Sequence, residues 1–246
     1  DMLYGGLEAI VHNQKRKRKN LKFYEFGKTY RDLGESKFEE IKRLGIWMTG
    51  DKNEESWQQG TASSDFYLLK EKVESVLNRV GVSKYKAESI SDCRFLTSVE
   101  FAKGKNSLVV FGRLSTSELK KADGKEAVYY AEFNWDVVLR MLSGKDIQFK
   151  VVSKFPSVRR DLALLIDESI AFEEIKAIAK KVEQRLLKEV NLFDVYEGKN
   201  LTAGKKSYGV SFTFQDENQT LTDKVIDRVM EKMIDSLGKQ VGAKLR

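Results

Sequence analysis

The sequence predicts an α+β fold in two domains, residues 1–149 and residues 150–246. Three observations predict it. The chain has 246 residues, which exceeds the usual single-domain size of roughly 100 to 150 residues. Its only proline, Pro156, excludes a helix at this position and favours an extended residue before it. From there to the C-terminus, the apolar pattern follows the order strand, helix, strand, strand, helix, strand.

The first half is predicted to be a mixed antiparallel sheet with few helices. An amphipathic helix begins at Gly5 and ends in the basic run 15–19, which suits the negative end of the helix dipole. This run has the charge to bind phosphates, but we favour the interpretation of a solvated helix end.

Apolar spacing gives the other elements of the first half. Residues 21–31 alternate and are rich in Phe and Tyr, and with a strand at 44–50 they predict a long hairpin whose loop covers 33–40. The remaining predicted elements are a helix at 65–82, strands at 84–89, 98–104, 107–114 and 128–133, and a short helix at 134–142. The aromatic strands 23–30 and 128–133 predict an apolar surface for a partner chain.

The second half begins with the apolar run Leu162–Ile166, which has the length of a buried strand and is ended by turn-forming residues. Apolar residues at helical spacing predict a helix over 171–190. Two strands follow, at 191–198 and 205–215, and the loop 199–205 joins them. The half is completed by a helix at 220–239 and a last strand at 240–246. This order is that of the ferredoxin-like βαββαβ fold, in which two helices cover one face of a four-stranded antiparallel sheet. The other face is free for function.

Several separated segments resemble one family. FPSVRRDLALLIDES, LFDVYEGKNLTAGKKSYGVSFTFQD, QTLTD and GAKLR together resemble the ferredoxin-fold anticodon-binding domain of the bacterial phenylalanyl-tRNA synthetase β subunit, over residues 153–246. HNQKRKRKNLKFYEFGKTY, RLGIWMTG, DFYLLKEKVESVL and AVYYAEFNWDVVL resemble the class II synthetase-like domain that precedes it. The chain departs from the family at Ser115 and Thr116, where relatives have histidine and proline.

The resemblance implies that the chain is the C-terminal part of a β subunit. The complete enzyme of that family is an α2β2 heterotetramer that joins phenylalanine to tRNA(Phe) with ATP and Mg²⁺. The α subunit would carry out the chemistry, and this chain would contribute tRNA binding and subunit assembly. We expect no cofactor bound to this chain itself.

Catalytic and metal-binding residues are not predicted in this chain. A class II active site needs an arginine on the strand of its second motif, where this chain has Tyr24 and Glu25, and no Gly-x-Gly-x-x-x-Arg pattern occurs. His12 and Cys93 are the only residues of their kinds, so no zinc site of nitrogen and sulfur ligands is expected. Two alternatives remain, an enzyme with its own active site in the first half and a purely structural assembly domain.

Strand alternation predicts the side chains on the free face of the second sheet. Tyr208, Val210, Phe212 and Phe214 should point to the helices, and Ser207, Gly209, Ser211 and Thr213 outward. The same alternation turns Phe193 and Val195 inward, and Asp194 and Tyr196 outward. Small residues around one exposed ring suit the unstacked bases of an RNA loop.

The predicted RNA-binding residues are Asp161, Asp194, Tyr196, Ser211 and Arg246 on the face, with Arg159, Arg160, Lys205 and Lys206 at its rim. The alternative is that these polar groups only tie the sheet edges together by hydrogen bonds and ion pairs.

The composition is that of a soluble globular protein, with 41% hydrophobic and 33% charged residues. A net charge of +7 permits an acidic partner without requiring one. No apolar stretch approaches the roughly 20 residues that span a bilayer, so we expect a cytoplasmic protein without a membrane partner. The chain begins Asp1-Met2 inside an apparent domain, and we therefore expect a fragment of a longer protein.

Overall fold

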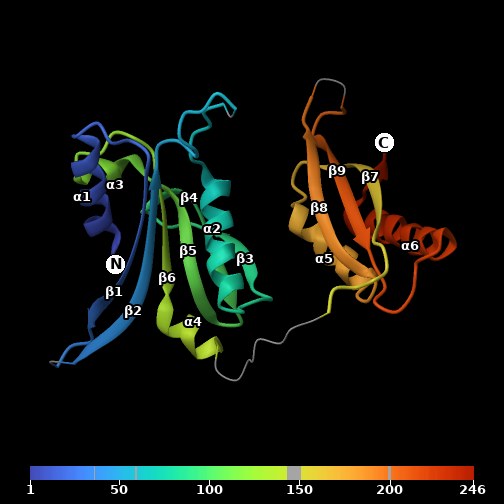
Figure 1. Ribbon diagram of the computed structural model, residues 1–246, viewed down its shortest axis with the longest axis horizontal. Helices are drawn as coiled ribbons and strands as arrows, with labels where there is room; N and C mark the ends of the chain where they lie inside the picture. The colour runs from blue at the N-terminus through green and yellow to red at the C-terminus, as the bar shows by residue number, and fades with distance from the viewer. Residues whose placement is uncertain (36, 59, 143–150, 199–200) are drawn as a thin grey trace. The chain divides into compact units, whose positions relative to one another are not determined.

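The computed structural model describes residues 1–35, 37–58, 60–142, 151–198 and 201–246, which form two compact units, 1–148 and 149–246 (Figure 1). The predicted domain boundary between positions 149 and 150 lies outside the described residues. Each unit contains one sheet with its own helices, and the first unit has two hydrophobic cores and the second unit one.

The first unit is built on a six-stranded sheet with the order β1-β2-β6-β5-β4-β3. All its neighbouring strands are antiparallel. The strands are β1 (Leu21–Asp32), β2 (Phe38–Thr49), β3 (Lys86–Ile90), β4 (Phe95–Lys103), β5 (Asn106–Leu114) and β6 (Val128–Asn134). The helices are α1 (Leu3–Gln14), α2 (Phe66–Arg79), α3 (Thr116–Lys121) and α4 (Trp135–Leu142).

Helices cover both faces of this sheet, and each face has a separate core. Side chains of α2 and α4 pack with Met48, Phe111 and Phe133 on one face. Side chains of α1 and α3 pack with Trp47 and Tyr130 on the other. The β6 residues therefore alternate between two cores and are nearly all buried. The prediction that 128–133 presents an apolar surface is wrong, because this strand lies in the middle of the sheet.

The first unit also differs from the predictions at helix and strand ends. Strand β2 begins at Phe38, so that the hairpin loop is shorter than expected. Helix α1 ends at Gln14, and the basic run follows the helix, with Lys17 in the left-handed region at φ 65°. Helix α3 was not predicted. It is only six residues long, and the Ser115 side chain caps it by accepting a hydrogen bond from the backbone N–H of Glu118.

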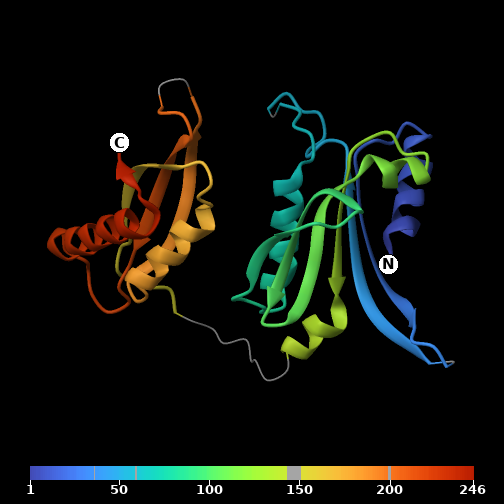
Figure 2. The same ribbon diagram turned by 180° about the vertical axis from the view of Figure 1, so that it is seen from behind.

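The second unit has the predicted ferredoxin-like βαββαβ fold. Its elements are β7 (Val158–Asp167), α5 (Phe172–Val182), β8 (Leu187–Tyr196), β9 (Lys205–Phe214), α6 (Asp223–Val241) and β10 (Lys244–Leu245). The antiparallel sheet has the order β10-β7-β9-β8. Both helices lie on the same face of it (Figure 2). They cover Leu164, Ile166, Val210 and Phe212, which confirms the predicted inward direction of these side chains.

The first helix of this unit ends earlier than predicted. Residues 187–190 belong to β8, and α5 stops at Val182. The carboxylate of Glu183 accepts hydrogen bonds from the backbone N–H groups of Arg185 and Leu186, both at 2.9 Å, and this turns the chain out of the helix. Leu186, Leu187 and Val190 are buried, so their apolar pattern was consistent with a helix as well as a strand.

The C-terminal helix is longer than predicted. Helix α6 continues to Val241 and is ended by Gly242, which adopts the left-handed conformation at φ 63°. The last strand is therefore only Lys244–Leu245, and it pairs with Leu165 and Leu164 of β7. After this turn the C-terminal residues run along the edge of the sheet beside β7, and the backbone N–H of Arg246 donates to the carbonyl of Ala163 at 3.0 Å.

Candidate nucleic-acid interface

The face of the second sheet opposite to α5 and α6, called the outer face below, has small residues in its middle. Register places Ala163 of β7 beside Gly209 of β9, which in turn pairs with Asp194 of β8. A Cβ atom on Gly209 would lie 2.9 Å from the Cβ of Asp194 and from the Phe193 ring. The lack of a side chain on Gly209 therefore allows its neighbours on β8 to approach the backbone closely.

Tyr196 and Arg246 meet on the outer face. The guanidinium carbon of Arg246 lies 5.0 Å from the centre of the Tyr196 ring, which is a cation–π distance. Tyr196 is half-buried and Arg246 is exposed. The phenol also packs on Gly198, where a Cβ would overlap the ring. The predicted outward direction of Tyr196 agrees with its pairing to Ser207 on the same face.

A second cation lies over a second ring on this face. Arg159 donates to both carboxylate oxygens of Asp161, at 2.7 and 3.2 Å, and these hydrogen bonds raise the pKa of the guanidinium above its ordinary value. Its carbon lies 5.3 Å from the centre of the Phe193 ring. The charge of Arg159 is thus largely matched by Asp161, while its planar group covers Phe193.

The predicted inward direction of Phe193 is wrong. The ladder between β8 and β9 shifts register between Leu192 and Asp194, so that Phe193 is the extra residue of a β-bulge. Its ring lies beside Gly209 on the outer face and is 51% exposed. Val195 keeps its predicted side, since it pairs with Tyr208, but it lies on an edge strand and is half exposed.

The other predicted residues of the outer face differ in accessibility. Lys205 lies at the end of β9, with its Nζ atom 3.6 Å from the carboxylate of Asp167. Hydrogen bonds from Ser169, together with Lys205, lower the pKa of Asp167 below its ordinary value. Asp194 is exposed, whereas Ser211 is only 4% exposed although it lies on the predicted face. Because the Ser211 side chain is buried, a ligand on the outer face cannot reach it.

Two predicted rim residues lie on the opposite face of the sheet. Lys206 is 8% exposed, and its Nζ atom lies 4.7 Å from the centre of the Tyr208 ring on the helix side. Arg160 pairs in register with Phe212, and its guanidinium donates to Asp223 at the start of α6 at 2.6 Å. The prediction overlooked that neighbouring residues on a strand point to opposite faces. Arg159 and Lys205 are on the outer face, and Arg160 and Lys206 are not.

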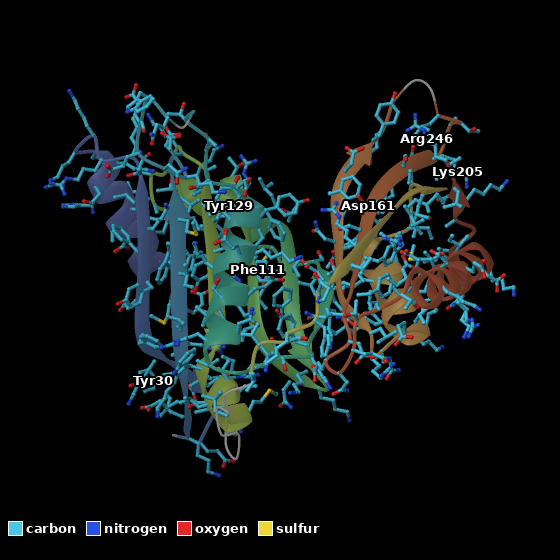
Figure 3. The ribbon with its side chains drawn as sticks, turned by 45° about the vertical axis from the view of Figure 1, so that its right-hand side comes forward. Tyr30, Phe111, Tyr129, Asp161, Lys205 and Arg246 are labelled. Carbon is cyan, nitrogen blue, oxygen red and sulfur yellow. The ribbon has the colours of Figure 1, made fainter. Side chains whose placement is uncertain are left out.

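The outer face thus brings together five predicted residues and one that was not predicted: Arg159, Asp161, Asp194, Tyr196, Arg246 and, in addition, Phe193. Lys205 joins them at the end of the sheet where it pairs with Asp167, and Figure 3 labels it together with Asp161 and Arg246. Two rings offer stacking surfaces, carboxylates offer acceptors for amino groups, and Arg246 and Lys205 offer positive charge. This combination suits an unstacked RNA strand.

The first unit carries a different kind of surface. A groove of about 770 Å³ crosses β1 and β2 beside α2, and Tyr24, Phe26, Leu44, Ile46 and Met48 line it. Tyr24 is 73% and Phe26 56% exposed, whereas Leu44 and Met48 of β2 on the same sheet face are buried in the core formed with α2 and α4. The predicted apolar surface on residues 23–30 is therefore present.

Neither a cluster of metal ligands nor a membrane-spanning helix occurs in the part of the chain that the structure describes. Its residues contain no group of three or more His, Cys, Asp or Glu side chains that could hold a metal ion. None of the helices in the described ranges has the length and apolar character needed to cross a membrane.

Both units match known families. Residues 1–135 match the family described as phenylalanyl tRNA synthetase beta chain CLM domain. Residues 153–246 match the family described as ferredoxin-fold anticodon binding domain.

Among curated proteins, the phenylalanine–tRNA ligase beta subunit of Bacteroides fragilis is 44% identical over 256 residues. The beta subunit of Porphyromonas gingivalis is 38% identical over 256 residues. Both alignments cover 100% of this chain and 31% of the relative, so the chain spans about a third of the length of these relatives. Among solved structures, pyrrolysyl-tRNA synthetase from Desulfitobacterium hafniense aligns with 58% of this chain and 49% of its own, at 16% identity and a TM-score of 0.45.

Proposed function

Because the chain belongs to the phenylalanyl-tRNA synthetase β chain family, we propose that it acts as the C-terminal part of the β subunit of phenylalanine–tRNA ligase. In this role it binds the anticodon stem and loop of tRNA(Phe) and takes part in subunit assembly, while the complete enzyme charges the tRNA with phenylalanine in the cytoplasm. The observation that carries the proposal is the pairing of Arg246 with Tyr196 on the outer face of a unit that matches an anticodon-binding family.

The outer face would divide its contacts between bases and phosphates. Tyr196 and Phe193 supply rings for stacking, which is worth about 1 to 3 kcal/mol per base. The carboxylates of Asp161 and Asp194 accept hydrogen bonds from base amino groups. Arg246 supplies a cation for phosphates, and Lys205 supplies a second one that faces Asp167 only at 3.6 Å, whereas Asp161 already accepts two hydrogen bonds from the guanidinium of Arg159.

ATP and Mg²⁺ do not fit the groove of the first unit. Its floor is apolar, with Tyr24, Phe26 and Ile46, and no carboxylate lines it among the described residues. Mg²⁺ is bound through carboxylate and phosphate oxygens, and the triphosphate needs cations held against it. Of the three cations that line the groove, Lys22 and Lys72 are already bonded, to the carbonyl of Lys52 and to Glu71, so that Arg79 alone among the described lining residues is left for a triphosphate. The ATP-dependent step therefore belongs to another part of the complete enzyme.

We assign the groove to the α subunit of the proposed α2β2 enzyme. Exposed aromatic side chains such as Tyr24 and Phe26 mark contact surfaces when they form a contiguous patch. Hydrogen–deuterium exchange of the chain, with and without α subunit, tests the assignment. Protection should increase in residues 22–26 and 44–48, and unchanged exchange throughout the first unit would exclude this interface.

Two hairpin RNAs test the proposed tRNA contact. The first is the anticodon stem-loop of tRNA(Phe), and the second has the same stem closed by an unrelated loop. We expect the chain to bind the first more tightly, because the rings of the outer face contact loop bases and the cations contact phosphates that both hairpins share. Equal affinity for the two hairpins would contradict anticodon recognition. Absence of binding to both would favour the alternative of a purely structural domain.

A further inference from the structure

Basic residues from separate segments of the first unit gather at one end of its sheet. The run Lys15, Arg16, Lys17, Arg18 and Lys19 follows α1, Arg113 is near the end of β5, Lys120 is in α3, and Lys125 follows α3. Helices α1 and α3 lie side by side at this end (Figures 1 and 2). Nζ of Lys15 lies 3.9 Å from the carboxylate of Asp123, which joins the two segments. We call this set of residues the basic cluster.

The cluster surrounds a hollow of about 710 Å³. Lys15, Arg113, Thr116, Lys120 and Lys125 line it together with Asp123. Arg113, Lys120 and Lys125 are exposed and have no salt-bridge partner among the described residues. Of the nearby carboxylates, Glu118 binds Lys121 at 2.7 Å outside the hollow, Asp123 faces Lys15 within it at 3.9 Å, and Glu126 is exposed next to Lys125. The positive charge of the hollow is therefore only partly compensated.

The chemistry of the lining selects the ligand. No aromatic ring lines the hollow among the described residues, so it offers no stacking surface for an unpaired base. Cations and a threonine hydroxyl are groups that contact phosphate oxygens. The basic run extends the positive surface beyond the hollow, and several cations in series match a chain of phosphates better than a single phosphate ion.

We propose that the basic cluster is a second RNA-binding surface, one that grips the phosphate backbone of a base-paired RNA helix without reading its sequence. The choice of RNA rests on the proposed function, in which the chain binds tRNA. The surface differs in kind from the outer face of the second unit, because it contains cations without rings. A paired helix hides its bases from side chains and is bound mainly through phosphates and shape.

Binding of a blunt RNA duplex of about 16 base pairs, a length that small duplex-binding domains span, tests the proposal with the full 246-residue chain. Such a duplex has no loop for the outer face. The cluster variant carries Arg113→Gln, Lys120→Gln and Lys125→Gln. The control variant loses the same charge through Lys37→Gln, Lys84→Gln and Lys105→Gln. These three exposed residues lie in loops at the opposite end of the sheet. Lys105 is roughly 25 Å from Arg113 along β5 at about 3.3 Å per residue.

The cluster variant should bind the duplex about tenfold more weakly, and the salt dependence of log K should flatten by about 0.7 to 0.9 for each phosphate that the variant no longer neutralises. The control variant should bind like the parent. Single Lys120→Gln and Lys125→Gln changes, both at exposed unpaired residues, give the same direction if the triple variant folds poorly. Equal weakening in both triple variants, or no duplex binding by the parent at low salt, overturns the proposal.

Two further measurements distinguish the basic cluster from the outer face and from a membrane-binding surface. Tyr196→Ala should leave duplex binding unchanged. Loss of anticodon stem-loop binding in this variant therefore tests the proposed tRNA contact, and duplex binding tests the basic cluster separately. Vesicles containing phosphatidylserine should not compete with the duplex for the cluster. Binding of these vesicles without binding of the duplex would overturn the proposal in favour of a membrane surface.

Discussion

The guanidinium of Arg246 lies 5.0 Å from the centre of the Tyr196 ring, although β10 and β8 are the opposite edges of the second sheet. Arg246 is held beside Ala163 by a backbone hydrogen bond, and Tyr196 pairs with Ser207 in the neighbouring outward row, so that the two side chains meet across the outer face. A ring and a cation in contact offer two separable functions, stacking on a base and attraction of a phosphate. Substitutions of the two residues should therefore have different effects on RNA binding.

Replacement of Tyr196 by Ala should weaken binding of the tRNA(Phe) anticodon stem-loop by about 1 to 3 kcal/mol with little change in the salt dependence. Tyr196→Phe keeps the ring and should bind almost like the parent. Fluorescence anisotropy over a range of salt concentrations measures both quantities. Tyr30→Ala, at a 65% exposed tyrosine of the first unit, is the matched control. Full affinity and an unchanged melting temperature in Tyr196→Ala would exclude the outer face as the base-binding surface.

Lys205 and Lys206 are adjacent in sequence but lie on opposite faces of β9, and this predicts opposite results. Lys205→Ala should weaken binding of any tRNA and flatten the salt dependence by about 0.7 to 0.9 in log-log slope. Lys206→Ala should leave that slope unchanged, because the ammonium group lies over Tyr208 on the helix side. It should instead lower the melting temperature. The same flattening in both variants would contradict the assigned faces.

The chain alone should form no phenylalanyl adenylate. The groove on β1 and β2 has an apolar floor and lacks a Mg²⁺ ligand among the described residues. Incubation with phenylalanine, ATP and Mg²⁺ should give pyrophosphate exchange no faster than a control without protein. Exchange above this control, abolished by substitutions within residues 20–50, would support instead the alternative of an active site in the first half.

Asp92 and Arg94 predict how the stability of the first unit depends on pH. Hydrogen bonds from Arg94, the shortest at 2.7 Å, lower the pKa of Asp92 below its ordinary value of 3.8. An aspartate with a lowered pKa stabilises the fold above its ordinary pKa, and this stabilisation is lost as the pH falls through the lowered value. Asp92→Asn should therefore cost about 1 to 3 kcal/mol at neutral pH and much less once the pH has fallen below the lowered pKa of Asp92.

Urea denaturation at several pH values measures this difference. Glu126→Gln is the control, because it also removes one carboxylate of the first unit, but from an exposed position, whereas Asp92 is partly buried. Its unfolding midpoint should stay close to that of the parent at every pH. A constant difference between Asp92→Asn and the parent from neutral pH to below the lowered pKa of Asp92 would contradict the role of the ionised carboxylate.

The alternation of apolar and polar residues predicted correctly which side chains point to each face of the second sheet wherever its strands are regular. Alternation identified Tyr208, Val210, Phe212 and Phe214 as core residues, and all four are in the core. Phe193 was misplaced because a β-bulge depends on how two distant strands pair, and its own segment still alternates. Sequence reasoning therefore missed an exposed ring in the candidate site, and no local signal marks it.

The ends of helices were predicted less well, for a different reason. Leu186 and Val190 have helical spacing with the residues of α5, but Glu183 turns the chain before them. The end of α5 thus depends on a side-chain contact with the backbone, which the apolar period does not contain. Likewise, the basic run 15–19 was predictable as a charge feature. Its neighbour Lys120 lies in a helix too short to show a period, and Lys125 lies in the segment that follows this helix.

The two cores of the first unit imply a gradient of local stability across its sheet. Strand β6 is covered on both faces and pairs with a strand on each side, whereas β1 and β3 are edge strands with many exposed residues. Amide hydrogens exchange through local opening, and opening costs most where burial is greatest. Exchange should therefore be slowest in β6, faster towards both edges of the sheet, and fastest in β3, where four of the five residues are exposed. Fluctuations of this unit would then begin at its edges and leave the central strand intact.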